Sequence, residues 1–311
     1  MATPPDQLEF DVPATCAHLG PGFGVLGVAV GITLHVTARE GSGARHAVEW
    51  RGSVPDVAVD PRHDVIARGI SAARDHFGIK MPDALEIVAD TKIPPASGLG
   101  TQTAGFAAGV GIATRYAKKP PPTDEILDLV VELGGDPAHA AAALIGGLAA
   151  AAPTTPPSAG LHFSALAHPL HEGWQFVIAC PAVRVATADA RRILPPTLPH
   201  GAVPRTVGRT VGLLRALADG NSEGLAGFLH DEVHVPFRRR LVPGIEEAMG
   251  AAREAGAAGV TISGHGPGIV ALTTDSATAE PIAAAMVEGF ASQQQEAHTL
   301  IAGAATTGAL S

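Results

Sequence analysis

The sequence predicts a protein of mixed helices and strands in two domains, for three reasons. Segments of β-branched alternation are interleaved with segments of helical spacing along the 311 residues. The 46% hydrophobic content allows a large core, and with only 4% aromatics that core must be mostly Ala, Val, Leu and Ile. A Pro- and Thr-rich segment at 152–158 interrupts two apolar regions. We therefore predict domains over 1–155 and 156–311.

Charge and composition restrict the kind of partner. A formal net charge of −9 argues against a broad surface for nucleic acid or an anionic membrane. The N-terminus has no basic segment followed by an apolar run, and the Ala-rich stretch at 138–152 is short and broken by glycines. Cys16 and Cys180 indicate ordinary thiols in a reducing compartment. We expect a cytoplasmic protein with a small-molecule substrate and no nucleic-acid or membrane partner.

The first half of the chain alternates strands with helices. β-Branched alternation predicts strands over 7–12 and 28–38, and the Gly-Pro-Gly between them predicts a loop over 13–24. Helical spacing predicts a helix over 64–77, and alternation then predicts a strand over 82–90. Three more helices are predicted, at 101–117, at 124–133 and from 138 onward.

The second half begins with a strand at 174–181, followed by helical segments. The helices are predicted at 204–219, 222–231 and 244–255. Two apolar strands within 259–272 are joined across a glycine turn.

Glycines stand directly before the predicted helix at 101, in IPPASGLGTQTA (93–104). Unpaired N–H groups at a helix start carry partial positive charge, so such a loop is either a plain tight turn or an anion site. Two further glycine loops, LGPGFG (19–24) and SGHGPG (263–268), are each explained singly as connections. Three such loops beside well-defined strands and helices favour a common site.

Together the three loops resemble the signature motifs of the GHMP small-molecule kinase superfamily and, within it, the homoserine kinases. PATCAHLGPGFGVLGVAV (13–30) is similar to the first motif, PPASGLGTQTA (94–104) to the phosphate-binding loop and ISGHGPGIVAL (262–272) to the third. The resemblance continues in DPAHAAAALIGGLA (136–149), TVGRTVGLL (206–214) and PFRRRLVPGIEEA (236–248). It covers nearly the whole chain.

The resemblance implies an α+β GHMP-kinase fold. The N-terminal phosphate- and nucleotide-binding domain would resemble domain 2 of ribosomal protein S5, and the C-terminal domain would be ferredoxin-like, with the active site between them. It further implies ATP and Mg²⁺ as cofactors, phosphoryl transfer to a hydroxyl of a small carboxylate-bearing substrate, and a homodimer. In such a transfer the protein mostly positions the reactants and neutralises charge.

The match to the phosphate loop implies the nucleotide side of the site. The implied residues are Pro95, Ser97, Gly98, Leu99, Gly100, Thr101, Gln102 and Thr103. Thr101 stands where the family has a serine that helps to hold Mg²⁺, and threonine can supply the same oxygen. A glutamate ligand of the family aligns with Gly134 or Gly135, and the nearby Asp136 could compensate. Thr101 and Asp136 are therefore the expected metal ligands.

The substrate side is implied by matches in the other motifs. The implied residues are His18, Gly24, His139, Arg209, Arg238, Gly264, His265 and Gly266. Arg209 and Arg238 match arginines that bind the substrate carboxylate, a task suited to guanidinium forks.

The first motif departs from that of homoserine kinases at the substrate. His18 and Gly24 replace an Asn and an Asp, and His139 replaces a second Asn. Because the Asp is the natural partner of an α-ammonium group, we infer a substrate with a carboxylate and no amine. The expected catalytic residues are Thr101, Asp136 and His18.

Three functions remain open at this point. The first is an ATP-dependent kinase of a small hydroxy acid. The second is a transferase that uses phosphoribosyl pyrophosphate and Mg²⁺, as in β-ribofuranosylaminobenzene-phosphate synthase, whose HFG-like first motif and GTQ loop are echoed at 18–20 and 100–102. The third is a non-catalytic binding protein, which the Gly134-Gly135 gap and the alanine run after it favour. Without the family match, the arginines would be surface charges and the histidines satisfied loop residues.

Overall fold

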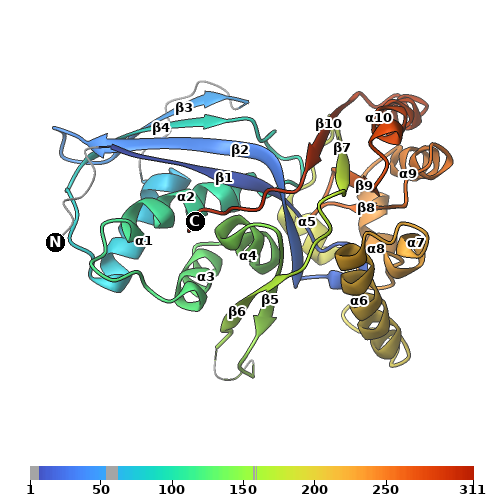
Figure 1. Cartoon of the computed structure of the whole chain (residues 1–311), viewed down its shortest axis with the longest axis horizontal. Coiled ribbons are helices and arrows are strands. Elements are labelled where there is room, and N and C mark those ends of the chain that lie inside the picture. The colour runs from blue at the N-terminus through green and yellow to red at the C-terminus, as the bar shows by residue number, and fades with distance from the viewer. Residues whose placement is uncertain (1–6, 54–61, 157, 159) are drawn as a thin grey trace.

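The computed structural model describes residues 7–53, 62–156, 158 and 160–311, which form two sheets with helices packed against them (Figure 1). The predicted mixture of helices and strands is confirmed. The strands are β1 (Gln7–Ala17), β2 (Leu26–Glu40), β3 (Ala47–Gly52), β4 (Leu85–Thr91), β5 (Leu148–Pro153), β6 (Phe163–His168), β7 (Gln175–Pro181), β8 (Gly259–Ile262), β9 (Ile269–Thr273) and β10 (Ala297–Gly303).

The helices of the N-terminal half are α1 (Val65–Phe77), α2 (Thr101–Thr114), α3 (Thr123–Glu132) and α4 (Pro137–Ile145). Those of the C-terminal half are α5 (Thr187–Arg192), α6 (Ala202–Asp219), α7 (Leu225–Phe228), α8 (Val235–Arg238), α9 (Ile245–Glu254) and α10 (Ser276–Ala291). Short 3-10 turns lie at η1 (Gly20–Gly22) and η3 (Arg239–Leu241). Each of these helices is too short or too polar to cross a membrane, within the ranges described.

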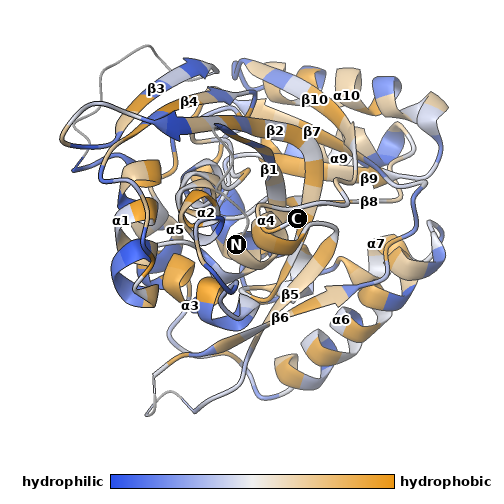
Figure 2. Ribbon diagram, turned by 60° about the vertical axis from the view of Figure 1, so that its left-hand side comes forward, coloured by the Kyte–Doolittle hydropathy of each residue, from blue (hydrophilic) through white to orange (hydrophobic). Residues whose placement is uncertain are grey.

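The first sheet has the order β3-β4-β2-β5-β6, with β1 also paired to β2. Helices α1–α4 lie on one side of it (Figure 1). Helix α2 is buried along almost its whole length, and hydrophobic colouring covers α4, whereas α1 and α3 also carry hydrophilic faces (Figure 2). The apolar faces are therefore turned into one core between helices and sheet.

The second sheet has the order β10-β7-β9-β8, and all its pairs are antiparallel. Along the chain its strands and principal helices run β7, α9, β8, β9, α10, β10. This is the βαββαβ arrangement of a ferredoxin-like unit. A separate apolar cluster lies between this sheet and helices α9 and α10.

Two predicted segments are corrected. The loop expected over 13–24 is shorter, because β1 continues to Ala17 by pairing with β2 across a register shift between Pro13 and Ala14. Of the helix expected over 222–231, only α7 is helical, since Asn221 and Asp231 bond nearby backbone N–H groups at its two ends.

The chain passes from the first sheet to the second after the Pro- and Thr-rich segment. Strand β6 pairs with β5 in the first sheet, and the second sheet begins with β7. The change of sheet therefore lies between His168 and Gln175, past the division at 155 and 156.

Candidate active site

The three glycine loops predicted from the sequence meet in space. The hydroxyl of Ser263 donates to the carbonyl of Gly98 at 2.8 Å, which joins the third loop to the phosphate loop. The N–H of Gly264 donates to the carbonyl of Ala17 at 2.9 Å, which joins the third loop to the first. Segments more than 160 residues apart are thus tied together at the junction of the two sheets.

Two glycines are required for this close approach. Gly98 has φ +79°, and a Cβ there would lie 2.4 Å from the carbonyl oxygen of Ser263. Gly264 has φ +56°, and its Cβ would lie 2.5 Å from Nε2 of His139. Any side chain at either position would be strained and would push the loops apart.

The phosphate loop ends in the N-terminus of α2. Gly100 is the N-cap, with φ +70° and no side-chain cap, so the first N–H groups of the helix lack a capping partner. The hydroxyls of Ser97 and Thr101 both donate to the carbonyl of Pro94, at 2.7 and 3.0 Å. These bonds fix the loop and leave the N–H groups at the start of α2 without side-chain caps, the arrangement with which helix N-termini can bind anions.

A cavity of about 330 Å³ opens beside this helix end. The predicted residues that line it are Ser97, Gly98, Gly100, Thr101, Gln102, Thr103, Asp136, His139, His265 and Gly266. Ala96, Gly134, Val185, Ala186, Thr187 and Arg191 complete the lining. Pro95, Leu99, His18, Gly24, Arg209, Arg238 and Gly264 are not in direct contact with this cavity.

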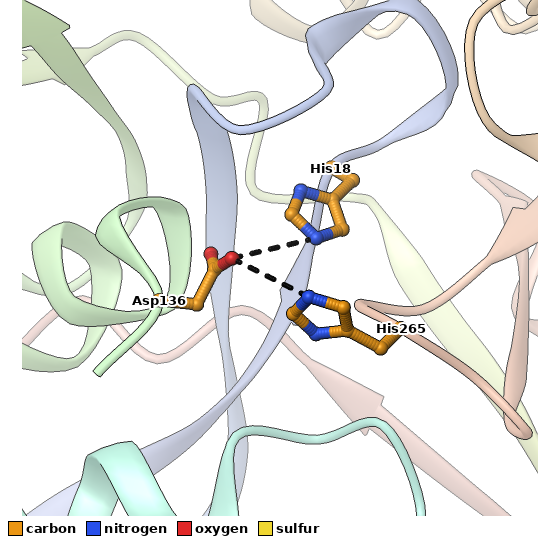
Figure 3. A group of neighbouring side chains, drawn as sticks. All are labelled: His18, Asp136 and His265. Carbon is orange, nitrogen blue, oxygen red and sulfur yellow. Dashed lines mark ion pairs between the residues drawn. The ribbon is translucent and has the colours of Figure 1, made fainter. Parts of the chain in front are cut away.

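Asp136 holds a central place in this site. It is the N-cap of α4, and its Oδ1 accepts from the N–H groups of Ala138 and His139 at 3.1 and 3.3 Å. Its other oxygen, Oδ2, faces Nε2 of His18 at 3.6 Å and Nε2 of His265 at 4.0 Å (Figure 3). The helix cap therefore fixes the carboxylate and leaves Oδ2 directed at two imidazoles.

His18 lies behind Asp136 in the loop after β1, with 1% of its surface exposed. Its Nδ1 accepts from the N–H of Gly24 at 2.9 Å, whereas its Nε2 is buried without a hydrogen-bond partner among the described residues. Burial, and then the neighbouring His234, holds its pKa well below the ordinary 6.5. The ring is neutral, and one of its nitrogens is left unsatisfied.

Three further histidines surround His18, with ring centroids 5.2 to 6.2 Å away. Nδ1 of His139 lies 2.7 Å from the hydroxyl of Thr15, and burial lowers the pKa of this histidine. His234 lies 3.0 Å by Nε2 from the carbonyl of Gly20. Burial is the main cause that lowers the pKa of His234 and of His265, each to about 4. The cluster is therefore uncharged at neutral pH.

Arg238 is fully buried beside this cluster. Its Nε donates to the carbonyl of Ala190 at 3.2 Å and its Nη1 to that of Gly264 at 3.1 Å. Desolvation lowers its pKa to about 10, so it stays charged near neutral pH. Arg191 lies close enough to lower the pKa of both Arg238 and His265 through its charge.

Arg209 lies apart from Arg191 and Arg238. Its Nη1 bonds Oε1 of Glu232 at 2.6 Å, and the same carboxylate bonds Arg205. These two bonds lower the pKa of Glu232 to about 2. The neighbouring Thr210 bonds the carbonyl of Pro21 at 3.2 Å, which places this part of α6 against the first loop.

Three residues in this region were not predicted from the sequence: Arg191, Thr187 and His234. Arg191 and Thr187 line the cavity, and their only signal is a polar segment directly after the apolar strand β7. His234 packs against Phe23, with ring centroids 5.0 Å apart, and it carries no motif signal. Only the folded chain brings these side chains to the glycine loops.

The chain matches two family models. The model of the GHMP kinases N terminal domain matches residues 64–147, and that of the GHMP kinases C terminal matches residues 211–292. The chain is 34% identical to homoserine kinase of Synechococcus sp. (strain WH7803) over 267 residues, which cover 85% of this chain and 83% of that protein.

Two further comparisons agree. The chain is 31% identical to homoserine kinase of Parasynechococcus marenigrum (strain WH8102) over 286 residues, 91% of this chain and 89% of that protein. It is also similar to the crystal structure of homoserine kinase from Cytophaga hutchinsonii, with a TM-score of 0.84 and 26% identity over 99% of this chain and 98% of that one.

Proposed function

The chain belongs to the GHMP kinase superfamily and is homologous to homoserine kinases, and on this premise we propose that it transfers the γ-phosphate of ATP to a hydroxyl of a small carboxylate-bearing substrate. The observation that carries the proposal is the cavity at the interlocked loops, lined by the N-terminus of α2 and by Arg191. A helix N-terminus suits phosphate and a guanidinium suits carboxylate, so this cavity can hold two anions.

The phosphate end of the proposed site is built from backbone. Gly98 and Gly100 leave N–H groups open at the start of α2, where the helix dipole also favours negative charge. Gln102 is exposed there and adds a neutral amide that can bond phosphate oxygens.

The donor set beside this loop fits the Mg²⁺ that accompanies ATP. Thr101 and Asp136 line the same cavity, and Oδ2 of Asp136 takes no part in the helix cap. Mg²⁺ commonly takes one or two carboxylates, with phosphates and water in its other positions. Gly134, also in the lining, has no side chain to serve as a ligand. Bound there, Mg²⁺ would neutralise charge on the phosphates.

We propose that the substrate carboxylate binds at the end of the cavity near Arg191 and Arg238. Among the described residues, the guanidinium of Arg191 has no ion pair or hydrogen-bond partner, and it reaches the cavity from α5. Arg238 lies behind it, fixed by two carbonyls. Together they give this end positive potential. For Arg209 to bind the same carboxylate, the substrate would have to displace Glu232.

The same cavity supports a substrate without an amine. Asp136 is the carboxylate in its described lining, and the nearby histidines are neutral. An ammonium group would have to compete with the arginines and the metal for Asp136. We therefore propose a hydroxy acid as substrate, with Thr101, Asp136 and His18 as the catalytic candidates.

The phosphoribosyl transferase alternative rests on Gln102 and His18 and is not favoured by the similarity to homoserine kinases. The deciding experiment incubates the protein and Mg²⁺ with hydroxy acids and either ATP or phosphoribosyl pyrophosphate, and identifies products by mass spectrometry. We expect ADP and a phosphorylated acid. Pyrophosphate with a ribosylated acid would contradict the kinase, and an absence of turnover with ligand binding would favour the non-catalytic alternative.

We also propose that the protein forms a homodimer and lies in the cytoplasm. On α6, Val203, Val207 and Val211 follow helical i, i+4 spacing and are each more than half exposed. An apolar stripe of this kind suits contact with a second copy. Light scattering across a concentration series tests for the dimer.

A further inference from the structure

We propose that His18, Asp136 and His265 form a binding site for a divalent transition-metal ion such as Zn²⁺ or Co²⁺. The two Nε2 atoms lie 3.6 and 4.0 Å from Oδ2 of Asp136, and the three ligand atoms lie within 4.8 Å of one another (Figure 3). The ligands come from the loop after β1, the start of α4 and the β8–β9 loop. Metal binding by these side chains does not depend on the proposed reaction.

The unsatisfied nitrogen of His18 is the first reason. Its Nε2 is buried, points toward Asp136 and has no partner among the described residues. Leaving a buried polar atom unpaired is unfavourable, because the atom has given up its hydrogen bonds to water. A metal ion between this atom and Oδ2 of Asp136 gives the unpaired nitrogen a partner.

The donor chemistry is the second reason. Two imidazoles and one carboxylate suit Zn²⁺ and its first-row neighbours, whereas Mg²⁺ prefers oxygen ligands in octahedral geometry. Both histidines are neutral because burial lowers their pKa, so no proton needs to be lost. The nitrogen ligands at His18 and His265 thus favour a transition metal at this three-residue site, whereas the Mg²⁺ that accompanies ATP would lie between Asp136, Thr101 and the phosphates.

Metal binding requires the three ligand atoms to move slightly closer together. Zn–N bonds of about 2.0–2.1 Å bring ligand atoms to roughly 3–3.5 Å from one another, so the imidazoles must move closer to Asp136. His265 can do so because it stands between Gly264 and Gly266 in the β8–β9 loop. Asp136 is held in place by its helix cap.

His18 must also change its tautomer. Since Nδ1 accepts from Gly24, the proton of the neutral ring is on Nε2. Coordination through Nε2 moves that proton to Nδ1, and the N–H of Gly24 must then turn away. Gly24 has no side chain to oppose this change, and no atom lies within 4 Å of the position that a Cβ there would occupy.

The site would keep an open position on the cavity side. Asp136 and His265 line the cavity, whereas His18 lies behind them. Three protein ligands leave a fourth position for water or a ligand oxygen. The ion would therefore lie where a phosphate or hydroxyl oxygen can reach it from the cavity.

The test measures binding of Zn²⁺, Co²⁺ and Mg²⁺ to the metal-free full-length protein without nucleotide. Zn²⁺ is followed by competition with a chromophoric chelator, Co²⁺ by its visible absorption and Mg²⁺ by calorimetry. The variants are His265→Ala, which removes a partly exposed ligand, and Asp136→Asn, which preserves the helix cap. The matched control is His35→Ala, because exposed His35 also lies beside two carboxylates, Glu9 and Asp11.

We expect one Zn²⁺ per chain, a Co²⁺ spectrum with nitrogen ligands and much weaker Mg²⁺ binding. His265→Ala and Asp136→Asn should each weaken Zn²⁺ binding by about 100-fold, since even loss of a partner outside the ligand set costs about 10–100-fold. His35→Ala should bind as the wild type does. The proposal is overturned by absent Zn²⁺ binding, by equal affinity for Mg²⁺, or by binding that survives both site variants.

Discussion

Replacing Gly98 by alanine should loosen the junction of the phosphate loop with the third loop. Gly98 has φ +79°, and its added Cβ would lie 2.4 Å from the backbone oxygen of Ser263. Gly78 offers a matched control, because it has φ +62° at the end of α1 and no atom within 4 Å of an added Cβ. The two substitutions share the backbone strain and differ in the clash.

The expected magnitudes follow from that difference. A non-glycine residue in the left-handed region costs about 1–2 kcal/mol, which is the expected effect of Gly78→Ala. Overpacking against a fixed neighbour adds about 1–3 kcal/mol, so Gly98→Ala should be destabilised by roughly 2–5 kcal/mol. The clash also separates Ser263 from Gly98, whose hydrogen bond holds the loops together.

Urea denaturation of both variants measures their free energies of unfolding. The turnover rate with ATP shows whether the active site is intact. Gly98→Ala should lose more stability than Gly78→Ala and most of its activity, while Gly78→Ala keeps its activity. Equal destabilisation of the two variants, or full activity in Gly98→Ala, would refute the role assigned to the interlocked loops.

Two more predictions concern charge. Arg191→Gln should raise the KM for the acid by at least about tenfold, as expected for loss of a charged contact. Arg192→Gln on the same helix should leave the KM unchanged because that side chain is exposed and pairs with Asp189; equal effects would contradict the assignment. The free energy of unfolding should fall as the pH drops from about 6.5 toward 4. The pKa values of His234 and His265 are lowered to about 4 in the folded state, so the unfolded chain binds more protons than the folded chain in that range. Urea midpoints that stay constant or rise from pH 7 to 4.5 would contradict this.

Local patterns in the sequence were enough for most of the fold and for the loops of the site. Alternation and helical spacing located β2, α1 and α6, since burial of one face imposes those periods. The loop predicted from the Gly-Pro-Gly was placed too early, because a register shift between Pro13 and Ala14 lets β1 continue to Ala17. The glycine loops were visible because their backbone conformations and close contacts restrict residue type.

The polar side chains of the site were harder to predict. Arg191 lies in a short helix whose charges resemble those of any exposed helix. It reaches the cavity only because the folded chain packs α5 near the phosphate loop. His234 reaches His18 across more than 200 residues. Such juxtapositions depend on tertiary packing, which no local period encodes.

The most direct test compares two substrates of the wild-type protein with ATP: homoserine and its deaminated analogue, 4-hydroxybutanoate. The described lining of the cavity presents arginine and neutral histidine around one carboxylate, so the kcat/KM values for the two acids should agree within about tenfold. In a site built to bond the ammonium group, the two kcat/KM values would differ by about 10⁴. A preference for homoserine well beyond tenfold, or phosphorylation of neither acid, would contradict a hydroxy-acid kinase that makes no use of the amine.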